Sequence, residues 1–124
     1  MTIKESQYSK CNKVLNKLMG EVEDGQLSRE EYTYISSYLN DSNFLVFGTG
    51  YDSNYWRCVN SNGHTLFLED DDTWIDLNYS DIIKVKYTSK RYQYKKLLKE
   101  YLAGTYTNLI IPLPEKIKET EWDV

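Results

Sequence analysis

Apolar side chains recur at helical spacing twice within the first forty residues of the chain. In the first stretch, which predicts a helix over about residues 6–20, the apolar positions are Tyr8, Cys11, Leu15, Leu18 and Met19. In the second, which predicts a helix over about residues 28–40, Ser28 and Glu31 form the capping-box pattern that begins helices. We therefore expect residues 1–42 to form a helical segment ahead of the rest of the fold.

From residue 43 onward, short apolar runs alternate with helical patterns. Strands are expected at residues 44–47, 65–68 and 82–87, with a possible fourth beginning at Trp122. Helices are expected at residues 53–60, around Trp74 with Ile75 and Leu77, and at 90–103. This alternation predicts an α/β fold with a mainly parallel sheet of about three or four strands and helices on both of its faces.

Candidate chemistry follows the first two expected strands. The first ends in Gly48-Thr49-Gly50, and glycines at such a turn let the backbone bend tightly and approach a ligand. The second ends in Glu69-Asp70, about twenty residues further on, where a carboxylate would face the same crevice and accept both hydroxyls of a ribose. The chain lacks the longer glycine motif and the Lys-Ser/Thr pair typical of phosphate sites. S-adenosylmethionine, which has a ribose but no phosphate, fits these residues.

Composition limits the remaining possibilities. A chain of 124 residues is long enough for one domain, and its net charge of −4 argues against attraction of the whole surface to nucleic acid or anionic membrane. The sequence contains no apolar run of the ~20 residues needed to span a bilayer, and residues 1–10 lack the apolar core of a secretory signal. We therefore expect a cytoplasmic protein in which Cys11 and Cys58 are reduced thiols. With one histidine and no CxxC pair, no metal site is expected.

One segment runs against the acidic balance of the chain. Residues 84–99 hold seven of the fifteen basic residues, with Tyr87, Tyr92 and Tyr94 among them. Aromatic rings between cations are able to stack on bases, so RNA binding is an alternative function, although nucleic acid is not the expected partner. The simpler interpretation is a solvated helix face whose Tyr94 and Tyr101 point inward with the leucines.

Longer stretches around the glycine turn are similar to a known family. Asn43-Phe-Leu-Val-Phe-Gly-Thr-Gly-Tyr-Asp-Ser53 and Asn62-Gly-His-Thr-Leu-Phe-Leu-Glu-Asp-Asp-Asp-Thr-Trp-Ile75 resemble the glucuronoxylan 4-O-methyltransferase family, the polysaccharide-biosynthesis-domain proteins of plant cell walls. The likeness runs from about residue 27 to the end of the chain and includes Leu113-Pro-Glu-Lys-Ile-Lys-Glu-Thr-Glu-Trp-Asp123. It implies a Rossmann-like fold that uses S-adenosylmethionine to methylate a sugar hydroxyl, such as that of glucuronic acid in a polysaccharide.

The resemblance also implies roles for individual residues. By position, the cofactor loop comprises Gly48, Thr49, Gly50, Asp52 and Ser53, while Glu69 contacts the ribose and Asp70 assists it. The chain departs from the family at Thr49, where a bulky aliphatic residue is usual, and at Tyr51, where a histidine is usual. If that histidine touches substrate, the choice of acceptor differs here.

The resemblance covers only the first half of the family's fold. We therefore expect residues 43–124 to be the cofactor-binding half of an apparently truncated methyltransferase domain, and no catalytic base is identified. A non-catalytic, methyltransferase-like binding or interaction protein is the alternative. A sheet that ends at a central strand exposes backbone and apolar groups, which predicts a homodimer or a complementing chain.

Overall fold

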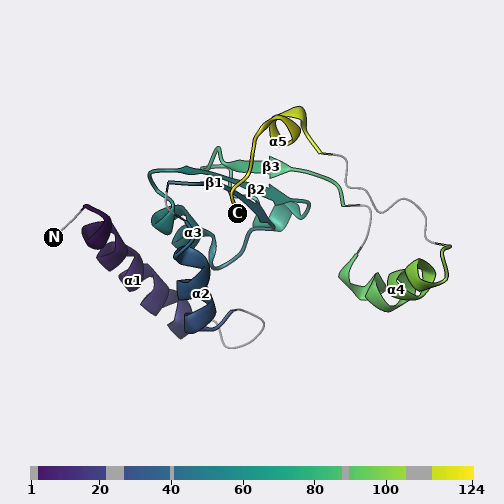
Figure 1. Ribbon diagram of the computed structural model, residues 1–124, viewed down its shortest axis with the longest axis horizontal. Helices are drawn as coiled ribbons and strands as arrows, with labels where there is room; N and C mark the ends of the chain where they lie inside the picture. The colour runs from purple at the N-terminus through teal and green to yellow at the C-terminus, as the bar shows by residue number, and fades with distance from the viewer. Residues whose placement is uncertain (1–2, 22–26, 40, 88–89, 106–112) are drawn as a thin grey trace.

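The computed structural model describes residues 3–21, 27–39, 41–87, 90–105 and 113–124 (Figure 1). The helices are α1 (Ile3–Glu21), α2 (Arg29–Ser36), α3 (Ser53–Val59), α4 (Tyr94–Leu102) and α5 (Glu115–Glu119), with short 3₁₀ turns η1 (Asp72–Trp74) and η2 (Arg91–Gln93). The strands are β1 (Asn43–Phe47), β2 (His64–Glu69) and β3 (Ile82–Lys84). Among these described residues, no helix is long and apolar enough to cross a membrane.

The three strands form one parallel sheet in the order β1-β2-β3, as the alternation of strand and helix predicts. The end of the chain lies along the other edge of β1. The Leu45 N–H donates to the Val124 carbonyl at 3.0 Å, and the Val124 N–H donates to the Asn43 carbonyl at 3.3 Å. Two such bonds on either side of Phe44 are the pattern of parallel pairing. The possible fourth strand beginning at Trp122 is not formed as a strand of the sheet, and the chain end contributes only these backbone hydrogen bonds to β1.

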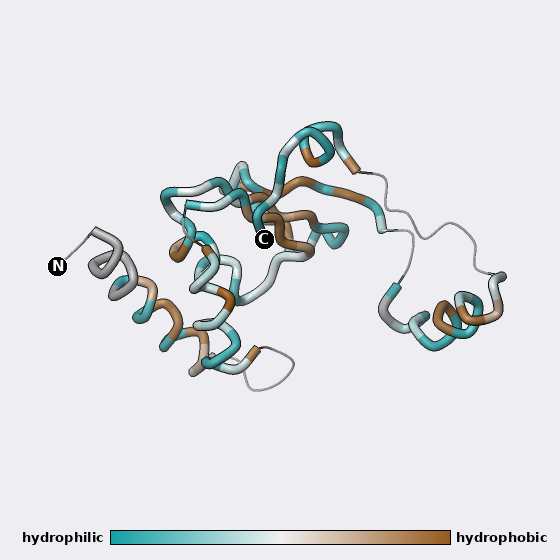
Figure 2. The backbone as a smooth tube through the Cα atoms, viewed as in Figure 1, coloured by the Kyte–Doolittle hydropathy of each residue, from teal (hydrophilic) through white to brown (hydrophobic). Residues whose placement is uncertain are grey.

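Side chains alternate between the two faces of the sheet, as the period of a strand requires. One face carries Phe44, Val46, Phe67 and Ile82, and packs against α1, α2 and α3. The other face carries Leu45, Leu66, Leu68 and Ile83, and packs against Ile117 of α5 and Trp122. Figure 1 shows α1, α2 and α3 on one side of the sheet and α5 on the other, and Figure 2 shows the apolar positions gathered along the strands. Helices therefore cover both faces.

The first face holds a covalent link that the sequence did not predict. Cys11 of α1 and Cys58 of α3 form a disulfide, so the prediction of two reduced thiols is wrong. Cys11 lies on the buried side of α1 with Leu15 and Leu18, and this side packs against α3. A separation of 47 residues hid the pairing, because it depends on how two distant helices meet.

Two predicted helices differ from the structure. The capping box of Ser28 and Glu31 is present, but α2 ends at Ser36 rather than near residue 40. The helix expected around Trp74 is only the turn η1, and the Leu77 side chain is 93% exposed. Side chains of Asp71 and Asp76 accept hydrogen bonds from backbone N–H groups two residues ahead, which favours turns over a continuous helix.

The C-terminal third differs in its side-chain packing. α4 lies within the expected range of 90–103, but Tyr94 and Tyr101 are exposed, so their expected inward orientation is wrong. The short helix α5 was not predicted. The apolar run 109–111 lies outside the described residues. Figure 1 shows α4 standing away from the sheet, and none of the residues of α4 is buried.

Candidate functional site

The backbone bend after β1 passes directly beside the end of β2. Gly48 has a φ of 97°, a conformation that side-chain-bearing residues rarely adopt. Its N–H donates to the Leu68 carbonyl at 2.6 Å, and a Cβ at this position would lie 3.9 Å from the Glu69 carboxylate. The glycine bend and the acidic strand end, which were predicted to face one crevice, are therefore adjacent.

The Glu69 carboxylate joins the bend to the loop that follows β2. The residue is only 7% exposed. Its Oε1 accepts from the Thr49 N–H at 2.8 Å and from the Thr49 hydroxyl at 3.1 Å, and its Oε2 accepts from the N–H groups of Asp70 at 3.0 Å and Asp71 at 3.1 Å. Four donors offset the cost of removing this carboxylate from water.

The Thr49 hydroxyl has two acceptors within reach. It lies 3.1 Å from Glu69 Oε1 and 2.5 Å from the carbonyl of Trp74. A hydroxyl has a single proton, so when it donates to Trp74, one lone pair of Glu69 Oε1 loses its donor. A hydroxyl group on a ligand is able to supply that missing donor. The site therefore combines a buried carboxylate with one exchangeable hydrogen-bonding position.

Two other predicted site residues face different partners. Asp52 accepts from the hydroxyl of Tyr32 at 3.2 Å, and burial together with this carboxylate raises the pKa of Tyr32 to about 12. Asp70 pairs with Lys90 at 3.0 Å, and this hydrogen-bonded carboxylate raises the pKa of the Lys90 ammonium. Asp52 thus ties α2 to the start of α3, and Asp70 ties the strand end to the segment before α4.

Ser53 closes the glycine turn. Its hydroxyl oxygen accepts from the Gly50 N–H at 2.9 Å, and the residue itself is buried.

The Tyr87 hydroxyl donates to the Leu68 carbonyl at 3.1 Å. Burial, followed by the negative charges of Glu69 and Asp70, raises the pKa of Tyr87 and keeps its hydroxyl protonated at the strand end. Tyr87 thus bonds to the end of β2, while Ser53 holds the glycine turn.

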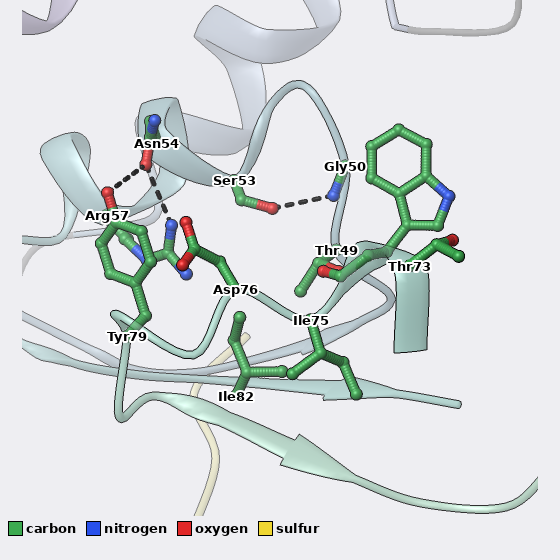
Figure 3. Close-up of a pocket in the computed structure, with 11 residues that line it drawn as sticks. Thr49, Gly50, Ser53, Asn54, Arg57, Thr73, Ile75, Asp76, Tyr79 and Ile82 are labelled. Carbon is green, nitrogen blue, oxygen red and sulfur yellow. Dashed lines mark hydrogen bonds between the residues drawn. The ribbon is translucent and has the colours of Figure 1, made fainter. Parts of the chain in front are cut away.

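A cavity of about 430 Å³ opens beside the bend, between α3 and residues 73–79 (Figure 3). Three predicted site residues line it: Thr49, Gly50 and Ser53. The remaining predicted residues are not part of its lining, and they are Gly48, Asp52, Glu69 and Asp70. Thr49 therefore belongs to both regions. Its hydroxyl and N–H bond to Glu69, and the residue also lines the cavity.

The cavity contains side chains that the sequence did not identify. Arg57 of α3 binds both carboxylate oxygens of Asp81 at 2.7 and 2.9 Å, and its guanidinium lies 3.6 Å from the centroid of the Tyr79 ring. Asn54 accepts from Arg57 at 2.9 Å and from the Tyr79 hydroxyl at 3.3 Å, as Figure 3 shows. No local pattern marks these residues, because Arg57 and Asp81 stand 24 positions apart.

Two exposed aromatic rings meet at the rim of the bend. Tyr51 and Trp74 make an edge-to-face contact with centroids 5.4 Å apart, and they are 61% and 42% exposed. Large aromatic side chains usually bury more of their surface than Tyr51 and Trp74 do. The exposed surfaces of these two rings are therefore available to a ligand.

The geometry defines an α/β protein with a glycine bend and a buried carboxylate at the ends of adjacent parallel strands. A sequence model of the IRX15/IRX15L/GXM family matches residues 32–124. The chain therefore belongs to this family, in agreement with the resemblance found in the sequence.

Named relatives come from Arabidopsis thaliana. Arabinogalactan O-methyltransferase 2 is 34% identical over 80% of this chain and 42% of its own length. Glucuronoxylan 4-O-methyltransferase 2 is 34% identical over 66% of this chain and 34% of its own length. The chain thus spans about two fifths or less of these relatives. No solved structure matches the chain.

Proposed function

We propose that this chain is the cofactor-binding part of an S-adenosylmethionine-dependent O-methyltransferase with a Rossmann-like fold, whose acceptor is a sugar hydroxyl in a polysaccharide, such as that of a glucuronic acid unit. The relatives named above are O-methyltransferases of arabinogalactan and glucuronoxylan. The observation that carries the proposal is the Glu69 carboxylate lying 2.8 Å from the N–H of Thr49 in the glycine bend. Adjacent strand ends of this kind are where adenosyl groups bind in open parallel sheets.

The residues present fit such a cofactor. When bound, S-adenosylmethionine supplies an activated methyl group. Gly48 and Gly50 let the backbone approach it without a Cβ in the way, and Glu69 would accept from one ribose hydroxyl at its exchangeable position. The Thr49 hydroxyl would shift its proton to the Trp74 carbonyl, which frees Glu69 Oε1 for the ligand. None of the described side chains is assigned as a catalytic base.

Calorimetric titration of the chain with S-adenosylmethionine tests the proposal. The wild type should bind, and Glu69→Gln should bind at least about tenfold more weakly, since it loses a charge-assisted hydrogen bond. Asp72→Asn provides the matched control. Asp72 lies three positions away and pairs with Lys84 outside the site, so its substitution should leave the affinity unchanged. Circular dichroism must show that the Gln variant is folded. Equal affinities of wild type and Glu69→Gln, or no binding to the wild type, would refute the assignment.

A non-catalytic binding or interaction protein is the second candidate. The observation that favours it is the complete set of protein donors around Glu69, which satisfies the carboxylate without a ligand. Any ribose must compete with the Thr49 hydroxyl for Glu69. The aliphatic residue that is usual in the family at this position has no hydroxyl and would not compete. A folded wild type with no affinity for S-adenosylmethionine would favour this candidate. A homodimer or a complementing chain stays a prediction for either case, and gel filtration tests it.

Localisation and nucleic-acid binding stay predictions as well. A cytoplasmic location was expected, yet the Cys11–Cys58 disulfide is typical of oxidising compartments. Alkylation of unreduced cell extracts, followed by mass measurement, distinguishes free thiols from the disulfide and so tests the expected location. Binding to RNA is not the proposed function; salt-dependent binding to a single-stranded RNA would revive it.

A further inference from the structure

We infer that the cavity between α3 and residues 73–79 binds a neutral sugar unit of the polysaccharide acceptor. The inference rests on the proposed function, which makes a polysaccharide the acceptor, and it assigns a binding site beyond the strand-end residues. The cavity is large enough for a small ligand, at about 430 Å³, and it adjoins the glycine bend through Thr49 and Gly50.

The polar groups of the cavity match the hydroxyls of a sugar. Asp76 uses one carboxylate oxygen to accept from the Asn78 N–H at 2.9 Å, and within the described part of the chain its other oxygen has no hydrogen-bond partner. The Asn54 amide accepts twice through its oxygen, but no described group accepts from its NH₂. Figure 3 shows the Asp76 carboxylate directed toward the Arg57 side chain of α3. The free oxygen of Asp76 suits the hydroxyl groups of a sugar, which donate as well as accept.

The apolar groups of the cavity match the C–H faces of a sugar ring. Ile75 and Ile82 line it together with the residues Trp74 and Tyr79. The face of an aromatic ring carries partial negative charge, which attracts the polarised C–H bonds of a sugar. A few placed polar groups among apolar and aromatic side chains are the usual composition of a small-molecule site.

Charge in the cavity selects a neutral ligand. The positive charge of Arg57 is already compensated, because its guanidinium binds both oxygens of Asp81. Asp76 forms no ion pair with any described residue, so the site carries an excess of negative charge. A uronate or a phosphate would be repelled. The site therefore suits a neutral unit of the chain that carries the methylated sugar.

Calorimetric titration of the full chain with defined saccharides tests this inference. The probes are a linear β-1,4-xylo-oligosaccharide, a β-linked galacto-oligosaccharide and free glucuronic acid. At least one neutral probe should bind, and glucuronic acid should bind more weakly. Asp76→Asn should weaken the neutral probe about fivefold, since it loses a hydrogen bond to a charged acceptor. Asp72→Asn makes the same chemical change outside the cavity and should have no effect.

The outcomes separate this inference from the proposed function. Sugar binding that depends on Asp76, without any affinity for S-adenosylmethionine, would support the sugar site and refute the cofactor proposal. Binding of S-adenosylmethionine without binding of either neutral probe would overturn the sugar site alone. Equal weakening by Asp76→Asn and Asp72→Asn, or tighter binding of glucuronic acid than of the neutral probes, would also overturn it.

Discussion

The strand-end site and the neighbouring cavity each contain a carboxylate, but the two carboxylates differ in their surroundings. Glu69 is buried and accepts four hydrogen bonds from Thr49, Asp70 and Asp71. Asp76 is exposed and accepts one, from Asn78. Glu69 therefore stabilises the fold, whereas the second carboxylate oxygen of Asp76 has no hydrogen-bond partner among the described residues. The difference teaches that a carboxylate predicted from a motif has a structural role that the motif does not reveal.

The largest effect is expected from removing the disulfide that anchors α3, one wall of the cavity. Replacing both Cys11 and Cys58 by serine should lower the free energy of unfolding by about 4 kcal/mol, because the link closes a loop of 47 residues. Urea denaturation with and without a reductant measures it. Affinity for neutral sugars should fall more than affinity for S-adenosylmethionine. Equal losses would show that the two regions are coupled through α3.

Truncating the two carboxylates sharpens the contrast. Glu69→Ala leaves three partly buried N–H groups without their acceptor and should lower the free energy of unfolding by about 2–3 kcal/mol. Asp76→Ala should leave it nearly unchanged, because the side chain is exposed. The measurement is again urea denaturation, with unfolding monitored by circular dichroism. Similar stabilities of the two variants would mean that Glu69 has no structural role.

How much of these regions the sequence predicted depends on whether each interaction is local in the chain or joins distant elements. The capping box at Ser28 and the glycine bend at Gly48 depend on neighbouring residues, and the sequence located both. The placement of Glu69 beside that bend followed from parallel strands in sequence order. Pairs that depend on packing between distant elements were missed. They include the Cys11–Cys58 disulfide, the Tyr32–Asp52 hydrogen bond and the Arg57–Asp81 ion pair.

The tie between α2 and the start of α3 predicts an intermediate effect at high pH. The pKa of Tyr32 is raised to about 12, so the folded protein keeps a proton that the unfolded chain releases near its ordinary pKa of about 10. Stability is complete below about pH 10 and falls toward pH 12, by at most about 1.4 kcal/mol per pH unit. Tyr32→Phe should flatten this fall and cost about 1 kcal/mol at neutral pH. A parallel decline in both proteins would contradict the assignment.

The smallest effect is expected at the edge of the strand-end site. Lys90→Ala removes the exposed partner of Asp70 and should lower the melting temperature only slightly. The difference should vanish at about 1 M salt, where charges are screened over about 3 Å. Thermal scans at low and high salt test this. A large loss that persists in high salt would mean that Lys90 contributes packing rather than charge.

The Glu69 carboxylate and the glycine bend are proposed to form one adenosyl site. Nuclear magnetic resonance of the ¹⁵N-labelled chain tests it most directly, because the amides of Thr49, Asp70 and Asp71 all bond to that carboxylate. Addition of S-adenosylhomocysteine should shift these three resonances together while that of Leu102, in α4, stays unchanged. Saturable binding that leaves all three resonances in place would contradict the claim.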